Sequence, residues 1–235
     1  MQLRGVFKNK QVVLVTDIFY GDSGKGKVTH RFASEREAEI VVRSGGGINT
    51  GARVVADNGI EFKLHLIPVG SIVPRKINFI TGQVLFDPAA FQEELKNIQQ
   101  HGYLLNNKYL NIDRMLPVSL PYHRLQDLSS EIMAGNGKIG TTGRGVGPAV
   151  MDFVGRYDSI RLEDLLDKKS LEEKLVNVLR LRQVLINEMF RIGKFSDNVK
   201  KAFLFDKGFE IFIDSEGNFD PRKIADALNN DVEIA

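Results

Sequence analysis

A glycine-rich turn near the start is the segment that most constrains this chain. Residues 21–27 read Gly-Asp-Ser-Gly-Lys-Gly-Lys and follow the apolar run 12–15, which is typical of a buried strand. A strand that leads through such a turn into a helix commonly binds phosphate, because glycines let backbone N–H groups converge on the anion and the helix N-terminus adds its dipole. The spacing fits the P-loop pattern G-x-x-x-x-G-K, although Val28 occupies the place of the Ser or Thr that holds Mg²⁺. The sequence therefore predicts a phosphate-binding turn, with an ordinary glycine-rich surface turn as the alternative.

Asp22 is the unusual member of this turn. A carboxylate next to bound phosphate is repelled unless a metal ion or a proton-transfer role compensates its charge. It could instead cap the turn through its own side chain, as in an Asx-turn. The other residues of the predicted phosphate loop are small or cationic: Gly21, Ser23, Gly24, Lys25, Gly26 and Lys27.

Composition excludes several classes of protein. The 235 residues are 43% hydrophobic and 26% charged, which is ordinary for a soluble globular protein. A net charge of +2 gives no electrostatic reason to expect nucleic acid or an anionic membrane as a partner. The absence of cysteine excludes disulfides and thiolate metal sites, and no apolar run approaches the roughly 20 residues of a membrane span. With no signal-peptide core at its start, the chain is expected to be cytoplasmic.

The pattern of apolar runs predicts an α/β fold. Short strand-like runs at 12–15, 40–42 and 77–80 alternate with helix-compatible segments at about 28–36 and 87–101. This alternation favours a mainly parallel, P-loop-like sheet with helical crossovers. A small antiparallel excursion is expected where 53–56 and 62–67 flank the Asn58-Gly59 turn signal.

The later part of the chain has a different character. A capping-box sequence at 170–173 precedes apolar residues with helical spacing, which predicts one long amphipathic helix at about 171–192. A last short strand at 209–213 and a final helix at 221–229 are expected to follow. The chain is therefore divided into a nucleotide-binding α/β core, 1–168, and a mostly helical tail of unassigned role, 169–235.

Two further glycine-rich loops carry candidate binding residues. The segment 43–53 follows the strand at 40–42 and contains Asn49, which can recognise an amide or a hydroxyl. The segment 140–149 combines Thr141 and Thr142 with Arg144 and four glycines, which suits a second phosphate contact. Each loop alone could be an ordinary turn, but three in one chain favour a common binding function.

Together the three loops resemble those of the adenylosuccinate synthetase family. The family motifs G-D-E-G-K-G-K, G-G-x-N-A-G-H and G-T-T-x-x-G-I-G-P-A correspond to this chain's loops at 21–27, 46–52 and 140–149, in the same order. The phrase Leu-His-Leu-Ile-Pro-Val-Gly at 64–70 is also similar to a family segment. The resemblance covers about residues 12–167.

This resemblance implies a purine-nucleotide ligase. The family joins aspartate to IMP at the expense of GTP, through a 6-phosphoryl-IMP intermediate, with Mg²⁺ as cofactor. Asp22 matches the family's general base and Mg²⁺ ligand, Lys25 matches a phosphate-contacting catalytic residue, and the carbonyl of Gly51 matches a second Mg²⁺ ligand. The resemblance further implies a homodimer in which one subunit supplies an arginine to its neighbour's IMP site. The matching IMP contacts in this chain are Asn49, Thr141, Thr142 and Arg156.

The chain departs from the family pattern in two ways. Ala52 stands where the family has a histidine that acts as an acid near the transferring phosphate, and loss of such a group commonly lowers rates by about 10²–10⁴. Arg53 could offer charge nearby, but in extended backbone its side chain should point to the opposite face. The family's guanine-reading element and arginine-rich aspartate loop have no counterpart between 170 and 235.

These departures leave three hypotheses open. The first is a ligase of the adenylosuccinate synthetase type with impaired turnover. The second is a non-catalytic nucleotide-binding or regulatory relative that pairs with another subunit. The third is a P-loop NTPase with a different substrate, which Val28 disfavours.

Overall fold

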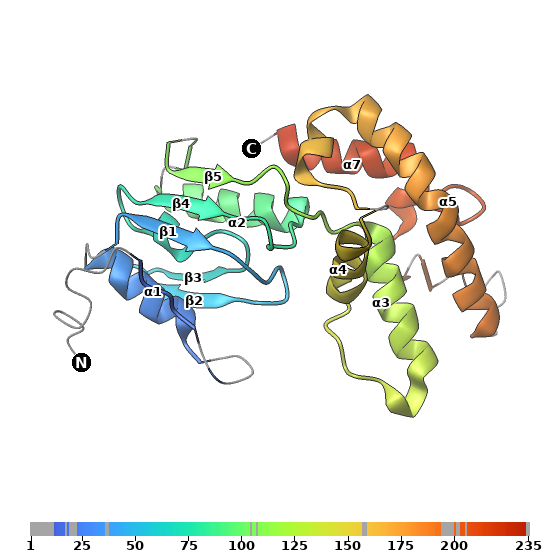
Figure 1. Ribbon diagram of the computed structural model, residues 1–235, viewed down its shortest axis with the longest axis horizontal. Helices are drawn as coiled ribbons and strands as arrows, with labels where there is room; N and C mark the ends of the chain where they lie inside the picture. Colours follow the sequence, from blue (N-terminus) through green and yellow to red (C-terminus); the bar gives the residue numbers. More distant parts are fainter. Residues whose placement is uncertain are drawn as a thin grey trace.

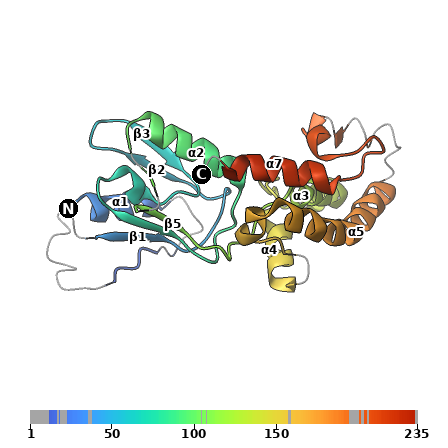
Figure 2. The ribbon, with the colours of Figure 1, turned by 90° about the horizontal axis from the view of Figure 1, so that it is seen from above.

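The computed structural model describes residues 12–16, 18, 23–35, 38–103, 105–106, 108–156, 159–193, 200, 203–204 and 206–233. The molecule is elongated, with the strands gathered at one end and most of the longer helices at the other (Figures 1 and 2). Among the described residues, no helix is both long enough and apolar enough to cross a membrane.

A three-stranded parallel sheet confirms the predicted α/β class. Strands β1 (Ile40–Arg43), β4 (Ile77–Ile80) and β5 (Leu110–Ile112) lie in the order β1-β4-β5. Helix α2 (Pro88–Gln100) makes the crossover from β4 to β5 and begins where the sequence predicts, because the Asp87 side chain accepts a hydrogen bond from Ala90 N at 3.1 Å.

The antiparallel excursion is a hairpin of β2 (Ala52–Val55) and β3 (Glu61–Leu64). Its turn contains Gly59 with φ of +83°, the left-handed conformation for which the Asn-Gly signal is selected. Helix α1 (Lys25–Ser34) packs against β2. The hairpin and α1 therefore form a second layer beside the parallel sheet (Figure 1).

Two predicted strands are wrong. The described residues 12–16 form no strand, and Val12 and Leu14 are 85% and 82% exposed, so the β-forming composition of this run is not matched by a partner strand. Residues 209–213 contain the 3₁₀ helix η4 (Glu210–Phe212) instead of a strand. Ile213 forms an isolated antiparallel bridge with Phe219, and one bridge does not extend into a strand without further cross-strand pairs.

The helical end consists of α3 (Pro121–Ala134), α4 (Val146–Gly155), α5 (Lys168–Ile192) and α7 (Pro221–Glu233). The long helix is confirmed, but it begins before the predicted capping box, since Asp167 caps it by accepting a hydrogen bond from Ser170 N at 3.1 Å. Of the apolar residues whose helical spacing predicts this helix, Leu171, Leu175 and Val178 are buried. Leu185 and Ile192, which share that spacing, are 39% and 56% exposed. Short 3₁₀ helices lie between these helices: η2 (Gly135–Gly137) between α3 and α4, and η3 (Leu162–Leu166) between α4 and α5. A further one, η1 (Val69–Ile72), lies between β3 and β4 at the strand end.

Two buried clusters correspond to the two ends of the molecule. The cluster at the strand end runs from Val54 to Leu116, and the cluster at the helical end runs from Val118 to Leu228. Leu162 packs against both clusters. Helix α3 therefore shares its core with α5 and α7. The functional boundary at residue 168 stays a prediction.

Candidate functional site

The N-terminus of α1 provides the described part of the predicted phosphate loop. Gly24 is the residue before the helix and adopts φ of +82°, a conformation that L side chains rarely adopt. As a glycine, this N-cap residue has no side chain that could cap the helix, and backbone N–H groups at a helix N-terminus suit an anion. Ser23, Lys25 and Lys27 are exposed there, whereas Gly21 and Asp22 lie outside the described residues.

Gly26 brings this first loop against the second. A Cβ atom on Gly26 would lie 2.4 Å from the Ala52 Cβ, closer than real Cβ atoms approach other atoms. The first turn of α1 therefore rests directly on the start of β2. Two loops that are more than 20 residues apart in the sequence meet at this contact.

Substitution of Gly26 by alanine tests this contact. Alanine gains up to about 1 kcal/mol of helix propensity over glycine, but overpacking costs about 1–3 kcal/mol, so the free energy of unfolding should fall overall. Urea titration followed by circular dichroism measures the change. The matched control is Gly147→Ala in α4, where an added Cβ meets nothing within 4 Å and stability should hold or rise slightly. Equal effects of the two substitutions would contradict the contact.

The part of the second loop that precedes β2, residues 44–51, is a compact turn closed by Thr50. The Thr50 N–H and hydroxyl both donate to Gly47 O at 3.0 Å, and Gly47 N donates to the Thr50 Oγ1 at 3.4 Å. Gly46 has φ of +81°, and a Cβ there would lie 2.4 Å from Thr50 Oγ1. Asn49 and Gly51 are exposed on this turn, so a ligand can reach the Asn49 side chain and the Gly51 backbone.

The third loop lies on α3. Gly145 (φ of +74°) donates its N–H to the Asp127 carboxylate at 3.0 Å, and the Glu131 carboxylate accepts from Ile139 N and Gly140 N. A Cβ at Gly145 would lie 2.6 Å from backbone atoms of α3, so this position needs glycine for close approach. Thr141 and Thr142 are exposed.

The structure brings the first and second loops together but places the third at the other end of the molecule. Figures 1 and 2 show the third loop between α3 and α4, away from α1 and β2. Arg156 lies at the end of α4 with φ of +71° and is exposed. The roles assigned to Thr141, Thr142 and Arg156 therefore stay predictions.

A buried polar network joins α3, α4 and α5. The Asp152 carboxylate accepts from the Tyr122 hydroxyl at 3.1 Å and from His123 Nε2 at 3.0 Å, and it pairs with Arg182. His123 Nδ1 accepts from Leu120 N at 3.0 Å, which fixes the tautomer with the proton on Nε2. Burial lowers the pKa of His123 below its ordinary value of 6.5, the positive charge of Arg182 lowers it further, and Asp152 opposes both.

Stability is therefore expected to fall on acidification through this histidine. Below about pH 6.5 the unfolded chain takes up a proton that folded His123 does not bind, so the free energy of unfolding decreases as the pH decreases. The decrease ends once the pH passes below the lowered pKa of the folded state. Urea titrations between pH 7.5 and 5 should show a smaller slope for His123→Gln than for the unmodified chain. Identical slopes would contradict this prediction.

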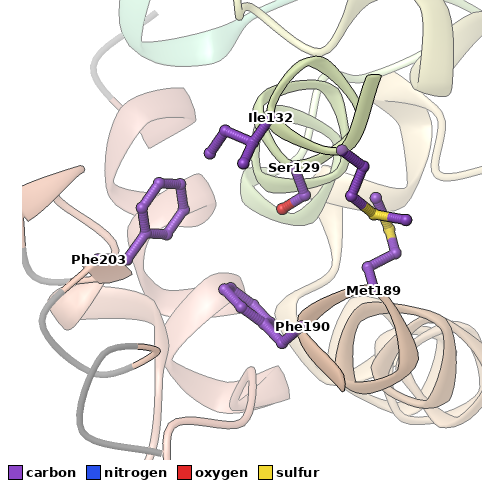
Figure 3. A pocket seen from close by; sticks show the side chains of 6 residues that line it. Ser129, Ile132, Met189, Phe190 and Phe203 are labelled. Carbon is purple, nitrogen blue, oxygen red and sulfur yellow. The ribbon is translucent and has the colours of Figure 1, made fainter. Parts of the chain in front are cut away.

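A small apolar pocket lies between α3, α5 and the segment after α5 (Figure 3). Its lining contains the Ser129 hydroxyl, which is buried without a hydrogen-bond partner. None of the predicted site residues lines it, and its apolar walls do not suit a phosphate. The lining residues are Ser129, Ile132, Met133, Met189, Phe190 and Phe203.

Mg²⁺ prefers few protein oxygens together with substrate phosphates and water. The exposed backbone of Gly51 fits such a sparse set, and Asp22, the other expected ligand, lies outside the described residues. Within the described part of the chain, no group of three or more His, Asp or Glu side chains could hold a metal ion.

Fold and loops together define an α/β protein with glycine-rich turns beside its strands. A family model described as adenylosuccinate synthetase matches residues 14–219, and the chain belongs to this family. The match continues beyond residue 167, where the motif resemblance stops, and includes α5.

Relatives in the family are longer than this chain. The chain is 44% identical over 173 residues to adenylosuccinate synthetase of Halothermothrix orenii, covering 74% of this chain and 39% of the relative. It is 42% identical over 191 residues to that of Bacillus cytotoxicus, covering 81% and 43%. The fold is similar to the fully ligated adenylosuccinate synthetase from Plasmodium falciparum, with a TM-score of 0.61, 20% identity, and 81% and 46% of the two chains covered. The chain thus spans about two fifths of the length of the curated relatives it matches.

Proposed function

We propose that this chain is the nucleotide-phosphate-binding part of a purine-nucleotide ligase of the adenylosuccinate synthetase type, which joins aspartate to IMP while GTP is hydrolysed. The observation that carries this proposal is the contact of Gly26 with Ala52, because it joins a helix N-terminus that begins at a glycine to a second glycine-rich turn. Helix N-terminal N–H groups and adjacent lysines suit an anion. The family membership of the chain supplies the class of substrate.

The residues around this contact have separate proposed roles. Backbone N–H groups after Gly24 and the side chains of Lys25 and Lys27 would bind phosphate and neutralise charge on the transferring group. Asp22 would remove the proton from the purine so that its 6-oxygen can attack the γ-phosphate of GTP. Aspartate then displaces that phosphate, and Asn49 would orient the IMP base.

Asp22 and the Gly51 carbonyl would hold Mg²⁺. When bound, the ion would supply Lewis-acid stabilisation of charge on the GTP phosphates. Thr141, Thr142 and Arg156 would contact IMP, the arginine from the neighbouring subunit of a cytoplasmic homodimer. The segment 1–168 would carry these sites, with 169–235 as a helical tail.

A second candidate function rests on one observation, the alanine at position 52. Without a proton donor there, the chain could bind nucleotide without turning it over, as a regulatory relative that pairs with another subunit. The neighbouring residue Arg53 does not replace the missing proton donor at position 52. Its Nε lies 3.3 Å from Glu61 Oε1 across the hairpin, so the two side chains form an ion pair.

Calorimetry with IMP and GTP, together and separately, in the presence of Mg²⁺ tests the proposal. Binding of both nucleotides, with phosphate release that requires IMP, GTP and aspartate, is the expected result for the ligase. Binding of IMP without GTP binding and without phosphate release would favour the regulatory relative. Failure to bind either nucleotide would overturn both. Lys25→Gln should weaken nucleotide binding about tenfold, whereas Lys96→Gln on the exposed face of α2 should not.

A further inference from the structure

Side chains from three elements outside the first loop meet around the second loop. Arg43 ends β1, His65 follows β3, and Glu94 lies in α2. None of the three is a predicted site residue. Their contacts converge on Thr50 and on the segment 65–67, at the open end of the β2–β3 hairpin, where Ala52 pairs with Leu64.

Thr50 receives a hydrogen bond from each side. Arg43 Nη2 donates to Thr50 Oγ1 at 2.8 Å. His65 Nδ1 lies 3.1 Å from Thr50 O, and because a carbonyl oxygen only accepts, Nδ1 is the donor. The His65 ring also lies beside Gly51, where a Cβ would be 3.1 Å from His65 Cε1. The Thr50 side chain is therefore held by a residue of β1, and its backbone by the residue that follows β3.

Glu94 fixes the segment that carries the histidine. Its carboxylate, on a residue only 7% exposed, accepts from His65 N at 2.6 Å, from Leu66 N at 3.1 Å and from Ile67 N at 3.0 Å. Burial raises the pKa of Glu94, and the three N–H groups and His65 oppose that rise. These three successive N–H groups are not paired within a strand and would otherwise need water. The Glu94 carboxylate accepts their hydrogen bonds instead.

Arg43 supplies the opposite charge in this region. Arg43 is half-buried; this burial lowers its pKa, and the negative charge of Glu94 acts to raise it. Its Nε atom is buried and has no hydrogen-bond partner among the described residues. Keeping an incompletely paired guanidinium partly out of water is costly, which argues that its bond to Thr50 matters to the molecule.

We propose that Arg43, His65 and Glu94 are positioning residues that hold the second loop in its binding conformation. Glu94 orients His65, and His65 together with Arg43 fixes Thr50, so that Asn49 and Gly51 on either side of it are already in place for the nucleotide. The nucleotide part of this proposal rests on the proposed function. The ordering of the loop does not, because it concerns the ligand-free chain.

Hydrogen exchange and calorimetry on the full chain test the two parts separately. Thr50→Val, His65→Leu and Glu94→Gln each remove one of these contacts. Each should speed amide exchange within 44–51 by about fivefold to tenfold, the effect of one lost hydrogen bond, and should weaken IMP binding by a similar factor. His65→Asn, which keeps a short N–H donor, should restore part of both.

Matched controls are available on α2. His101→Leu removes another histidine whose Nδ1 bonds a backbone carbonyl, that of Asn97 at 2.8 Å, and Glu93→Gln alters the exposed neighbour of Glu94. Neither should change exchange in 44–51 or IMP binding. Unchanged loop exchange in all three test variants would overturn the proposal, and so would faster exchange with unaltered IMP affinity. If the unmodified chain binds no IMP, the proposed function fails, and exchange alone then supports or overturns the ordering of the loop.

Discussion

Ala52→His should raise phosphate release that depends on both IMP and GTP by about 10²–10⁴, the contribution of a positioned proton donor next to a transferring phosphoryl group. Position 52 lies at the start of β2, against the helix N-terminus that we propose binds phosphate. Ala52 and buried Val54 share one face of β2, and the Ala52 Cβ lies against Gly26 in the first turn of α1. Arg53 and its partner Glu61 are on the exposed face, as the alternation of an extended strand requires.

The control for this prediction is Ala52→Gln, which supplies a hydrogen-bond donor of similar reach without a titratable proton. Initial rates of phosphate release, measured with all three substrates and with each omitted, distinguish the variants. A histidine variant no faster than the glutamine variant would show that a proton donor at this position is not what turnover lacks. Adding Asp22→Asn to the histidine variant should remove the gain.

Asp152→Ala should lower the free energy of unfolding by about 3–5 kcal/mol, the usual cost of removing one partner from a buried ion pair. Asp152 is the shared acceptor for Tyr122, His123 and Arg182, so its loss leaves a partly buried guanidinium and two buried donors without that carboxylate. The three helices α3, α4 and α5 meet at this point. Urea titration followed by circular dichroism is the suitable measurement, because the chain has no tryptophan.

Asp226→Ala is the matched control, since Asp226 pairs with Lys168 where both side chains are about half exposed. Exposed pairs contribute about 0–1 kcal/mol, so this variant should remain close to the unmodified chain. Asp152→Asn keeps the shape and one acceptor oxygen, and it should fold with a smaller loss if the alanine variant does not fold. Equal losses for Asp152→Ala and Asp226→Ala would contradict the role assigned to the buried network.

Local sequence signals were reliable where the physical cause is itself local. Asp87-Pro88 predicts the start of α2, Asn58-Gly59 predicts the hairpin turn, and the spacing of Leu171, Leu175 and Val178 predicts the buried face of α5. The same kind of signal failed at 12–15 and 209–213. A strand depends on its neighbours, and propensity cannot say whether a neighbour is there.

The candidate site likewise has one part that the sequence predicts and another part that it does not. The three glycine-rich loops are visible in the sequence because glycine, lysine and threonine at short spacing carry their own chemistry. The buried charges that hold these loops are not visible. Glu94 lies 27–29 residues from the N–H groups whose hydrogen bonds it accepts, and Asp127 lies 18 residues from Gly145. Isolated acidic residues in helical segments are normally expected to be solvated.

The sequence by itself determined the α/β class, the loops and the family, because backbone conformation at glycine, helix capping and short motifs depend on adjacent residues. Only the tertiary structure decided that α1 rests on β2 through Gly26, that Arg43, His65 and Glu94 surround the second loop, and that α3 shares a core with α5 and α7. These features depend on contacts between residues far apart in the chain. Burial, which makes unpaired charges costly and close packing specific, arises only when those residues come together.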